Sequence, residues 1–196
     1  MSVALHEVMR HALLVILIAC HHPAAKVDDG PPGDVATSDA PVGAKPPNIV
    51  LILTDDLDVG VYNQFPTLKA LMDDKGAAFH DHFVNVSLCC PSRTAILRGQ
   101  YAHNTKIFSN GPPNGGFETF FANHSEDQTL PVWLSAAGYR TVLMGKYLNG
   151  YPNTAPDLYV PPGWTEWYSP VAGDPYGEYN YTLREYNPDV DTAPHD

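Results

Sequence analysis

Runs of apolar residues along the chain predict where its strands lie. Residues 48–54 form a continuous apolar run rather than an alternating one, which is typical of a strand buried on both faces of a parallel sheet. Residues 140–144 predict a second such strand, and residues 78–86 are a further strand candidate. The last quarter of the chain is rich in Pro, Gly, Tyr and Trp, so we expect surface loops there, including residues 161–168 and 179–182.

Helix signals alternate with these strands. Capping and stop residues predict helices over residues 66–75, 89–98 and 131–137, which end at Gly76, Gly99 and Gly138. Alternation of strands and helices indicates an α/β protein, in which ligands lie beyond the carboxyl ends of the strands. Polar residues follow both main strands, and we therefore expect Asp55, Asp56 and Lys146 to share one edge of the sheet.

The N-terminus has the pattern of a targeting segment. Residues 12–19 form an apolar run that is too short to span a bilayer and has the length of a signal-peptide core. The run ends in Leu-Ile-Ala-Cys, which is similar to a bacterial lipobox and implies cleavage before Cys20 and lipidation of that cysteine. An ordinary secretory signal and a misplaced start codon are the alternatives.

Composition then divides the rest of the chain. Residues 20–47 are rich in Pro, Gly, Ala and Asp and have almost nothing to bury, which predicts a disordered tether between the signal peptide at 1–19 and a domain at 48–196. The formal net charge of −11 excludes a nucleic-acid backbone as the partner, because that role needs a basic surface. An anionic small substrate is still compatible with this charge, since it needs only local positive charge. Three cysteines do not suggest a disulfide framework.

A five-residue motif gives the sharpest chemical signal. Residues 89–93 read Cys-Cys-Pro-Ser-Arg, and with the short helix that follows they resemble the signature of the type I sulfatases. The resemblance implies that a formylglycine-generating enzyme oxidises Cys89 to formylglycine, whose hydrate is the nucleophile. Cys90 occupies the free position of the motif. Two buried structural thiols and a soft-metal site are the alternatives.

The resemblance assigns roles to further residues. It implies that Asp55 and Asp56 bind a divalent cation, Ca²⁺ or Mg²⁺, together with the formylglycine oxygen at position 89, and hard carboxylate oxygens suit either ion. A plain acidic loop is the alternative reading. Arg93 lies one helical turn after Cys89, so the two can share a helix face, and in the family this arginine holds the hydrate. Lys146 matches the lysine that contacts the sulfate group.

One position departs from the family pattern. Many sulfatases place a histidine two residues after the lysine, where this chain has Leu148, so the role of that histidine is unfilled or passed to Asn149. The version Gly-Lys-Tyr-Leu-Asn is similar to glucosamine-6-sulfatases and extracellular endosulfatases.

The resemblance also implies a fold and an activity. It covers residues 47–192 and implies the amino-terminal part of an alkaline phosphatase-like sulfatase fold, with a mostly parallel sheet flanked by helices and incomplete at the C-terminus. The expected activity is hydrolysis of sulfate esters, on sulfated carbohydrates or aryl sulfates, by an exported lipoprotein anchored in the bacterial cell envelope. Because the resemblance covers only the amino-terminal part of the family domain, we expect this chain to be a truncated fragment that is inactive or incomplete. The alternatives are a phosphodiesterase or phosphonate monoester hydrolase, and a non-catalytic envelope lipoprotein remnant.

Overall fold

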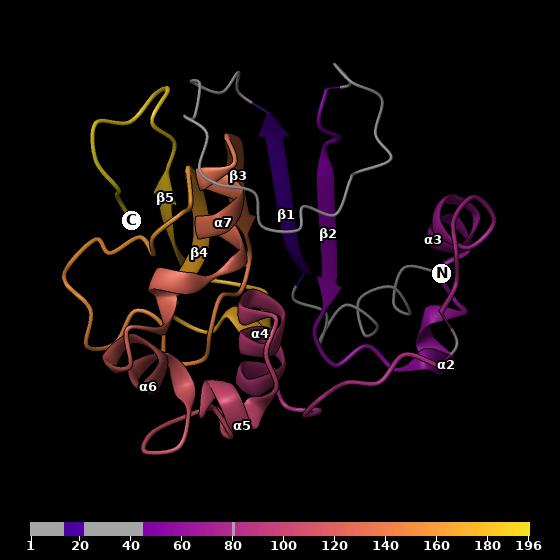
Figure 1. Cartoon of the computed structure of the whole chain (residues 1–196), viewed down its shortest axis with the longest axis horizontal. Helices are drawn as coiled ribbons and strands as arrows, with labels where there is room; N and C mark the ends of the chain where they lie inside the picture. The colour runs from indigo at the N-terminus through magenta and orange to yellow at the C-terminus, as the bar shows by residue number, and fades with distance from the viewer. Residues whose placement is uncertain (1–13, 22–44, 80) are drawn as a thin grey trace, which may run out of the picture.

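The strands form one mixed sheet with the order β2-β1-β3-β4-β5 (Figure 1). The computed structural model describes residues 14–21, 45–79 and 81–196. Within them the strands are β1 (Leu14–His21), β2 (Ile49–Thr54), β3 (Tyr139–Met144), β4 (Glu166–Ala172) and β5 (Thr182–Tyr186).

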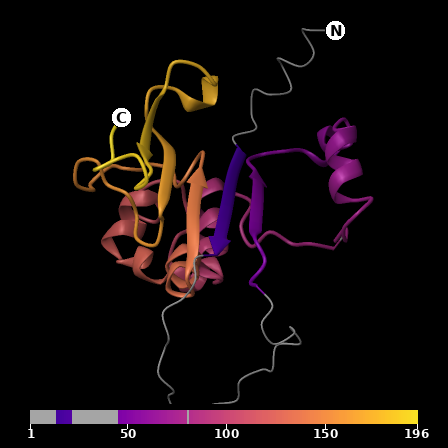
Figure 2. The same cartoon turned by 90° about the horizontal axis from the view of Figure 1, so that it is seen from above.

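Helices of the described part cover one face of this sheet. Figure 2 shows α4, α5, α6 and α7 on the same side of the strands, whereas α2 and α3 stand beside the edge strand β2. The helices are α2 (Val59–Tyr62), α3 (Pro66–Met72), α4 (Cys89–Arg98), α5 (Ala102–Thr105), α6 (Gly116–Ala122), η2 (Ser125–Gln128), α7 (Leu130–Ala136) and η3 (Pro175–Gly177). None of them has the length and apolar character that crossing a bilayer requires.

The strand directions differ from the mostly parallel sheet that the sequence predicts. Only β3 and β4 pair in parallel among the described strands, whereas β1 pairs antiparallel with both β2 and β3, and β5 pairs antiparallel with β4. The sheet is not mostly parallel because β1 lies between β2 and β3, which would otherwise be parallel neighbours. Because β2 and β3 are both antiparallel to β1, they still run in the same direction. Their carboxyl ends therefore meet at one edge of the sheet, as expected.

Local signals from the sequence are mostly confirmed in the first two thirds of the domain. Strands β2 and β3 and helices α3, α4 and α7 lie where the patterns place them. The strand candidate at residues 78–86 is wrong, because its described residues form turns and irregular structure. Phe79 and Phe83 are 80% and 86% exposed there, so these two apolar side chains do not pack in the core as those of a buried strand would.

The loops expected near the C-terminus are also partly wrong. Residues 161–168 run into β4, and residues 179–182 run into β5. Trp167 is fully buried and packs with Tyr147, Tyr151 and Trp164 in an aromatic cluster at the centre of the core. Tyr147 of this cluster belongs to the turn that follows β3, so packing of the late strands supports the carboxyl edge of the sheet.

The N-terminal predictions fall partly outside the described residues. Residues 1–13 and 22–44, which include most of the expected tether, are among those not described. Residues 14–21, which hold most of the expected signal-peptide core and Cys20, form β1 between β2 and β3. Cleavage and lipidation at Cys20 remain predictions.

Candidate active site

Two acidic residues and a cysteine meet beyond the carboxyl end of β2. Asp55 and Asp56 follow β2 directly, and Cys89 is the first residue of α4. One ligand atom from each of the three, two carboxylate oxygens and the Sγ atom, lies within 4.8 Å of the others. The Cys89 thiol lowers the pKa of the neighbouring Asp55 carboxyl slightly, which agrees with this proximity. The residues that the sequence motif singles out are thus brought together by the fold.

Asp56 turns the chain immediately after Asp55. Its φ of 56° lies in the left-handed region, which non-glycine residues adopt uncommonly and which Asp tolerates better than most. Asp55 is buried whereas Asp56 is exposed. The turn therefore leaves one carboxylate within the protein and the other open to solvent.

Two cations share the Asp55 carboxylate. Lys146 Nζ donates a hydrogen bond to Asp55 Oδ2, and Arg93 Nη2 lies 3.3 Å from the same oxygen. The other terminal nitrogen of Arg93 donates to the backbone carbonyl of Lys146 at 2.7 Å. Arg93 thereby links α4 to the turn after β3. All three side chains are buried, so water screens these charges only weakly.

This arrangement sets the charge of the site. Burial raises the pKa of the Asp55 carboxyl, but the hydrogen bond from Lys146 and the positive charge of Arg93 outweigh it and hold that pKa below its usual value. Burial lowers the pKa of Lys146, but its hydrogen bonds with Asp55 and Tyr176 outweigh this and raise the pKa overall. Asp55 is therefore ionised and Lys146 protonated at neutral pH. The buried part of the site thus holds two cations and one carboxylate, whereas the second carboxylate, that of Asp56, is exposed to solvent beside them.

The two neighbouring cysteines differ in their surroundings. Cys89 is partly exposed at the site, whereas Cys90 is fully buried in the core. Burial raises the pKa of the Cys90 thiol to about 11, against the lowering effect of nearby backbone hydrogen bonds. The Cys90 amide donates to Asn110 Oδ1 at 2.8 Å. Cys90 is thus a structural thiol, and Cys89 is the cysteine that faces the acidic pair.

Chemistry decides how well these side chains fit a hard divalent cation. The carboxylates of Asp55 and Asp56 are suitable ligands for Ca²⁺ or Mg²⁺. The thiol of Cys89 is not, because soft sulfur ligands select other metals. An oxygen in place of that sulfur makes the donor set of all three positions hard. The residues present therefore fit the expected cation with an oxidised residue at position 89.

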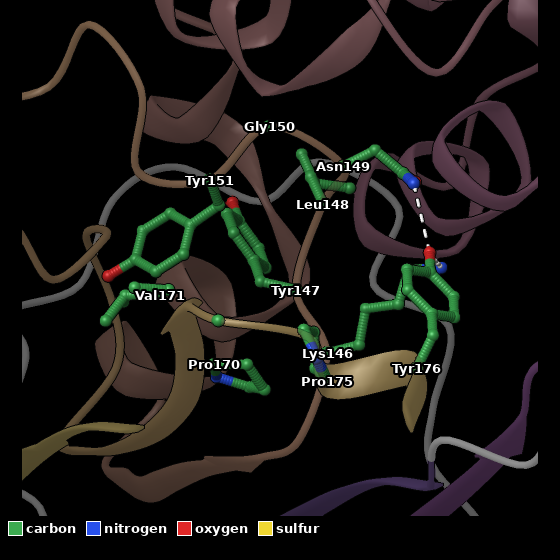
Figure 3. A pocket seen from close by; sticks show the side chains of 12 residues that line it. Lys146, Tyr147, Leu148, Asn149, Gly150, Tyr151, Pro170, Val171, Pro175 and Tyr176 are labelled. Carbon is green, nitrogen blue, oxygen red and sulfur yellow. Dashed lines mark hydrogen bonds between the residues drawn. The ribbon is translucent and has the colours of Figure 1, made fainter. Parts of the chain in front are cut away.

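Sequence reasoning missed a tyrosine at the site. The hydroxyl of Tyr176, from η3, accepts hydrogen bonds from Lys146 Nζ at 2.7 Å and from Asn149 Nδ2 at 3.3 Å (Figure 3). Leu148, in the place of the family histidine, is 3% exposed and packs in the core. No periodic pattern or motif marks Tyr176 in its irregular segment. Only the fold reveals its position.

Comparisons with known proteins agree with this geometry. The chain is 42% identical over 139 residues to the extracellular sulfatase SULF-1 homolog of Drosophila melanogaster, which covers 70% of this chain and 12% of that protein. It is 40% identical over 148 residues to human N-acetylglucosamine-6-sulfatase, covering 72% of this chain and 26% of the relative. It is 35% identical over 145 residues to an arylsulfatase of Chlamydomonas reinhardtii, covering 71% and 21% respectively.

The match therefore spans only part of each relative, between 12% and 26% of its length. A comparison with solved structures found no match. The model of the sulfatase family matches residues 47–192, which include Asp55, Asp56, Cys89, Arg93 and Lys146. This chain belongs to the sulfatase family.

Proposed function

We propose that this chain carries the nucleophile side of a sulfuric ester hydrolase site. The observation that supports it best is the meeting of Cys89 with Asp55 and Asp56 within 4.8 Å, beside two buried cations. The proposal names Cys89, Arg93 and Lys146 as catalytic residues. It names Asp55, Asp56 and the oxidised residue at position 89 as ligands of a divalent cation, Ca²⁺ or Mg²⁺.

The protein groups meet the main difficulty of sulfate ester cleavage, which is negative charge on the ester oxygens. Lys146 is the cation that contacts the sulfate in this proposal, and Arg93 holds the nucleophile from one helical turn away. Fixed cations in a water-poor site stabilise developing charge far better than cations in bulk water do. The amino end of α4, where Cys89 lies, adds partial positive charge.

Two groups complete the proposed chemistry. When bound, the divalent cation acts as a Lewis acid on the sulfate oxygens. A formylglycine hydrate at position 89 would offer two hydroxyls, one to attack sulfur as the ester alcohol leaves and a second whose oxygen would re-form the aldehyde as sulfate departs. Serine has only one hydroxyl. Cys89 is the residue that the Cys-x-Pro-Ser-Arg spacing selects for this oxidation by a formylglycine-generating enzyme.

We infer the substrate class from the relatives. Their names point to extracellular sulfatases, N-acetylglucosamine-6-sulfatases and arylsulfatases. Sulfate esters of sugars are therefore the proposed substrates, with aryl sulfates as laboratory analogues, and the protein is proposed to be exported. Anchoring in a bacterial envelope through Cys20 stays a prediction.

Mass spectrometry of the Cys89 peptide tests the proposed nucleophile. The full chain is co-expressed with a formylglycine-generating enzyme and digested. We expect the mass of an aldehyde at position 89 in the native chain. The same aldehyde is expected in Cys90→Ala, because Cys90 is the free position of the motif and is buried in the core. Cys89→Ala should carry no aldehyde.

Two results would count against the proposal. An unmodified thiol at position 89 would favour the non-catalytic alternative. Loss of the aldehyde in both cysteine variants would contradict the assignment of Cys89. If the aldehyde forms, parallel assays of a full-length relative with an aryl sulfate and an aryl phosphonate distinguish a sulfatase from a phosphonate monoester hydrolase.

A further inference from the structure

We propose that Tyr176 binds the alcohol part of the substrate, and that the pocket between Tyr176 and the segment 146–151 receives a single ring attached to the sulfate. This inference rests on the proposed function, because it takes Lys146 as the sulfate contact. It adds a residue and a subsite, and it places the ring next to the ester group. Its observations are the pocket, the exposure of Tyr176 and its hydrogen bonds.

The pocket begins at the proposed sulfate site. Lys146 lines it, and its wall is formed by the residues that follow, by Pro170–Gly173 after the centre of β4, and by Pro175 and Tyr176 (Figure 3). The cavity volume is about 210 Å³. Pockets that enclose drug-sized ligands are larger, roughly 300–1,000 Å³, so this one suits one ring rather than a chain of them. Because Lys146 itself lines the pocket, a ligand held at Lys146 lies at the wall of the pocket.

Tyr176 has no role in the core. It is 52% exposed, and its ring packs below the Lys146 ammonium, with Nζ 4.9 Å from the ring centre. The short helix η3 holds it there, since the Asp174 side chain accepts a hydrogen bond from the Gly177 amide at 3.1 Å. A large, half-exposed ring at the rim of a pocket leaves part of its surface available to a ligand.

The polar groups of Tyr176 indicate what kind of ring fits. Its hydroxyl accepts from Lys146 and from Asn149, and it donates in neither bond. A tyrosine hydroxyl has one proton to donate, so this proton can go to an oxygen of the ligand. An aromatic face together with one hydroxyl and a nearby amide suits a ring with apolar C–H faces and oxygen substituents. A pyranose has both features.

Binding measurements with two sulfate esters test this inference. Isothermal titration of the full chain, co-expressed with a formylglycine-generating enzyme and with CaCl₂ present, uses N-acetylglucosamine 6-sulfate as the ring-bearing probe and methyl sulfate as the ringless one. We expect Tyr176→Ala to weaken the first by about tenfold, the size of one aromatic contact, and the second by less than about threefold. Tyr176→Phe keeps the ring and should restore most of the lost affinity for the sugar.

Matched variants distinguish failure of the ring subsite at Tyr176 from failure of the sulfate site at Lys146. Tyr179→Ala, at a tyrosine that is 82% exposed, should bind both probes like the native chain. Lys146→Ala should weaken both probes alike. Equal weakening of both probes by Tyr176→Ala, or no weakening of either, would overturn the ring subsite while the sulfate site stands. No effect of Lys146→Ala, or no binding of either probe by the native chain, would overturn the proposed function and this inference with it.

Discussion

At the scale of single residues, Asp55 organises the site. Its carboxylate is contacted by an ammonium and a guanidinium, and a thiol lies within 4.8 Å of it; the three groups come from two other segments of the chain. Removing one member of a buried ion pair costs more than the pair contributes, because the remaining charge stays buried without compensation. Asp55 leaves two such charges behind, Arg93 and Lys146.

We therefore predict that Asp55→Asn lowers the free energy of unfolding by about 3–5 kcal/mol at neutral pH. The pKa of Asp55 is held below its usual value of 3.8, so its contribution is fully present above pH 3.8 and is lost as the pH falls through the lower folded-state pKa. Chemical denaturation across this pH range should show less acid sensitivity in Asp55→Asn.

The neighbouring carboxylate provides the control for this prediction. Asp56→Asn, at an exposed side chain, should change the free energy of unfolding by less than about 0.5 kcal/mol. Equal destabilisation by both substitutions would show that the two carboxylates act as one unit, against the roles assigned to them here.

Much of the candidate site could be predicted from the sequence because its signals are local. Cys89 and Arg93 are four residues apart, and the acidic pair and Lys146 each follow a continuous apolar run. Tyr176 could not be predicted, because its contacts with Lys146 and Asn149 span 30 and 27 residues of sequence. Its position depends on how β4 is aligned with β3.

At the scale of elements, the site stands where two strand ends meet the start of α4. Gly145 makes the turn after β3 with φ of 108°, which favours glycine, and its amide donates to the Tyr168 carbonyl in β4 at 2.8 Å. Lys146 is thus fixed by both strands. The sequence indicated β2 and β3 through their apolar runs. The sequence did not indicate β4, because Pro170 and the surrounding Gly and Pro residues favour a loop.

A buried acid supports the turn that carries Lys146. Glu126, in η2, accepts hydrogen bonds from the hydroxyls of Tyr147 at 2.9 Å and Tyr159 at 2.6 Å. Burial raises its pKa, and the two tyrosine hydrogen bonds only partly offset this, so the folded-state pKa lies above the usual 4.5. A raised carboxyl pKa contributes stability that is fully present below pH 4.5 and lost as the pH rises through the folded-state value.

We predict that Glu126→Gln reduces this loss of stability with rising pH. The free energy of unfolding, measured by denaturant titration from pH 4.5 upward, should decline less in Glu126→Gln than in the native chain, because the glutamine has no charge to bury. Glu178→Gln, at an exposed side chain, is the matched control and should follow the native profile. A native slope in Glu126→Gln would contradict the assignment.

At the scale of the whole molecule, the fold class was predictable but the strand directions were not. Alternating strands and helices indicate an α/β protein, and the match of the sulfatase family agrees with this class. A pattern of apolar runs does not say which strand lies between two others. The segment 14–21 reads as a targeting segment by composition, and only its pairing with β2 and β3 identifies it as a strand.

The place of β1 makes a prediction for a chain that begins at Cys20. All six pairs between β1 and β2 use residues 14–19, so cleavage before Cys20 removes that pairing completely. We expect the amides of residues 49–54 to exchange with solvent faster in a chain of residues 20–196 than in the full chain, measured by hydrogen exchange and mass spectrometry. The amides of residues 166–172 in β4 are the internal control. Equal protection of 49–54 in both chains would contradict the prediction.

Folding and secretion compete for the same strand, β1. β1 has a neighbour along each edge, so its backbone is engaged on both sides once the sheet has closed. If residues 12–19 are the signal that the export machinery recognises, this signal is no longer accessible in a folded precursor. Export then depends on capture of the nascent chain before the sheet closes, and slower closure would favour delivery over retention.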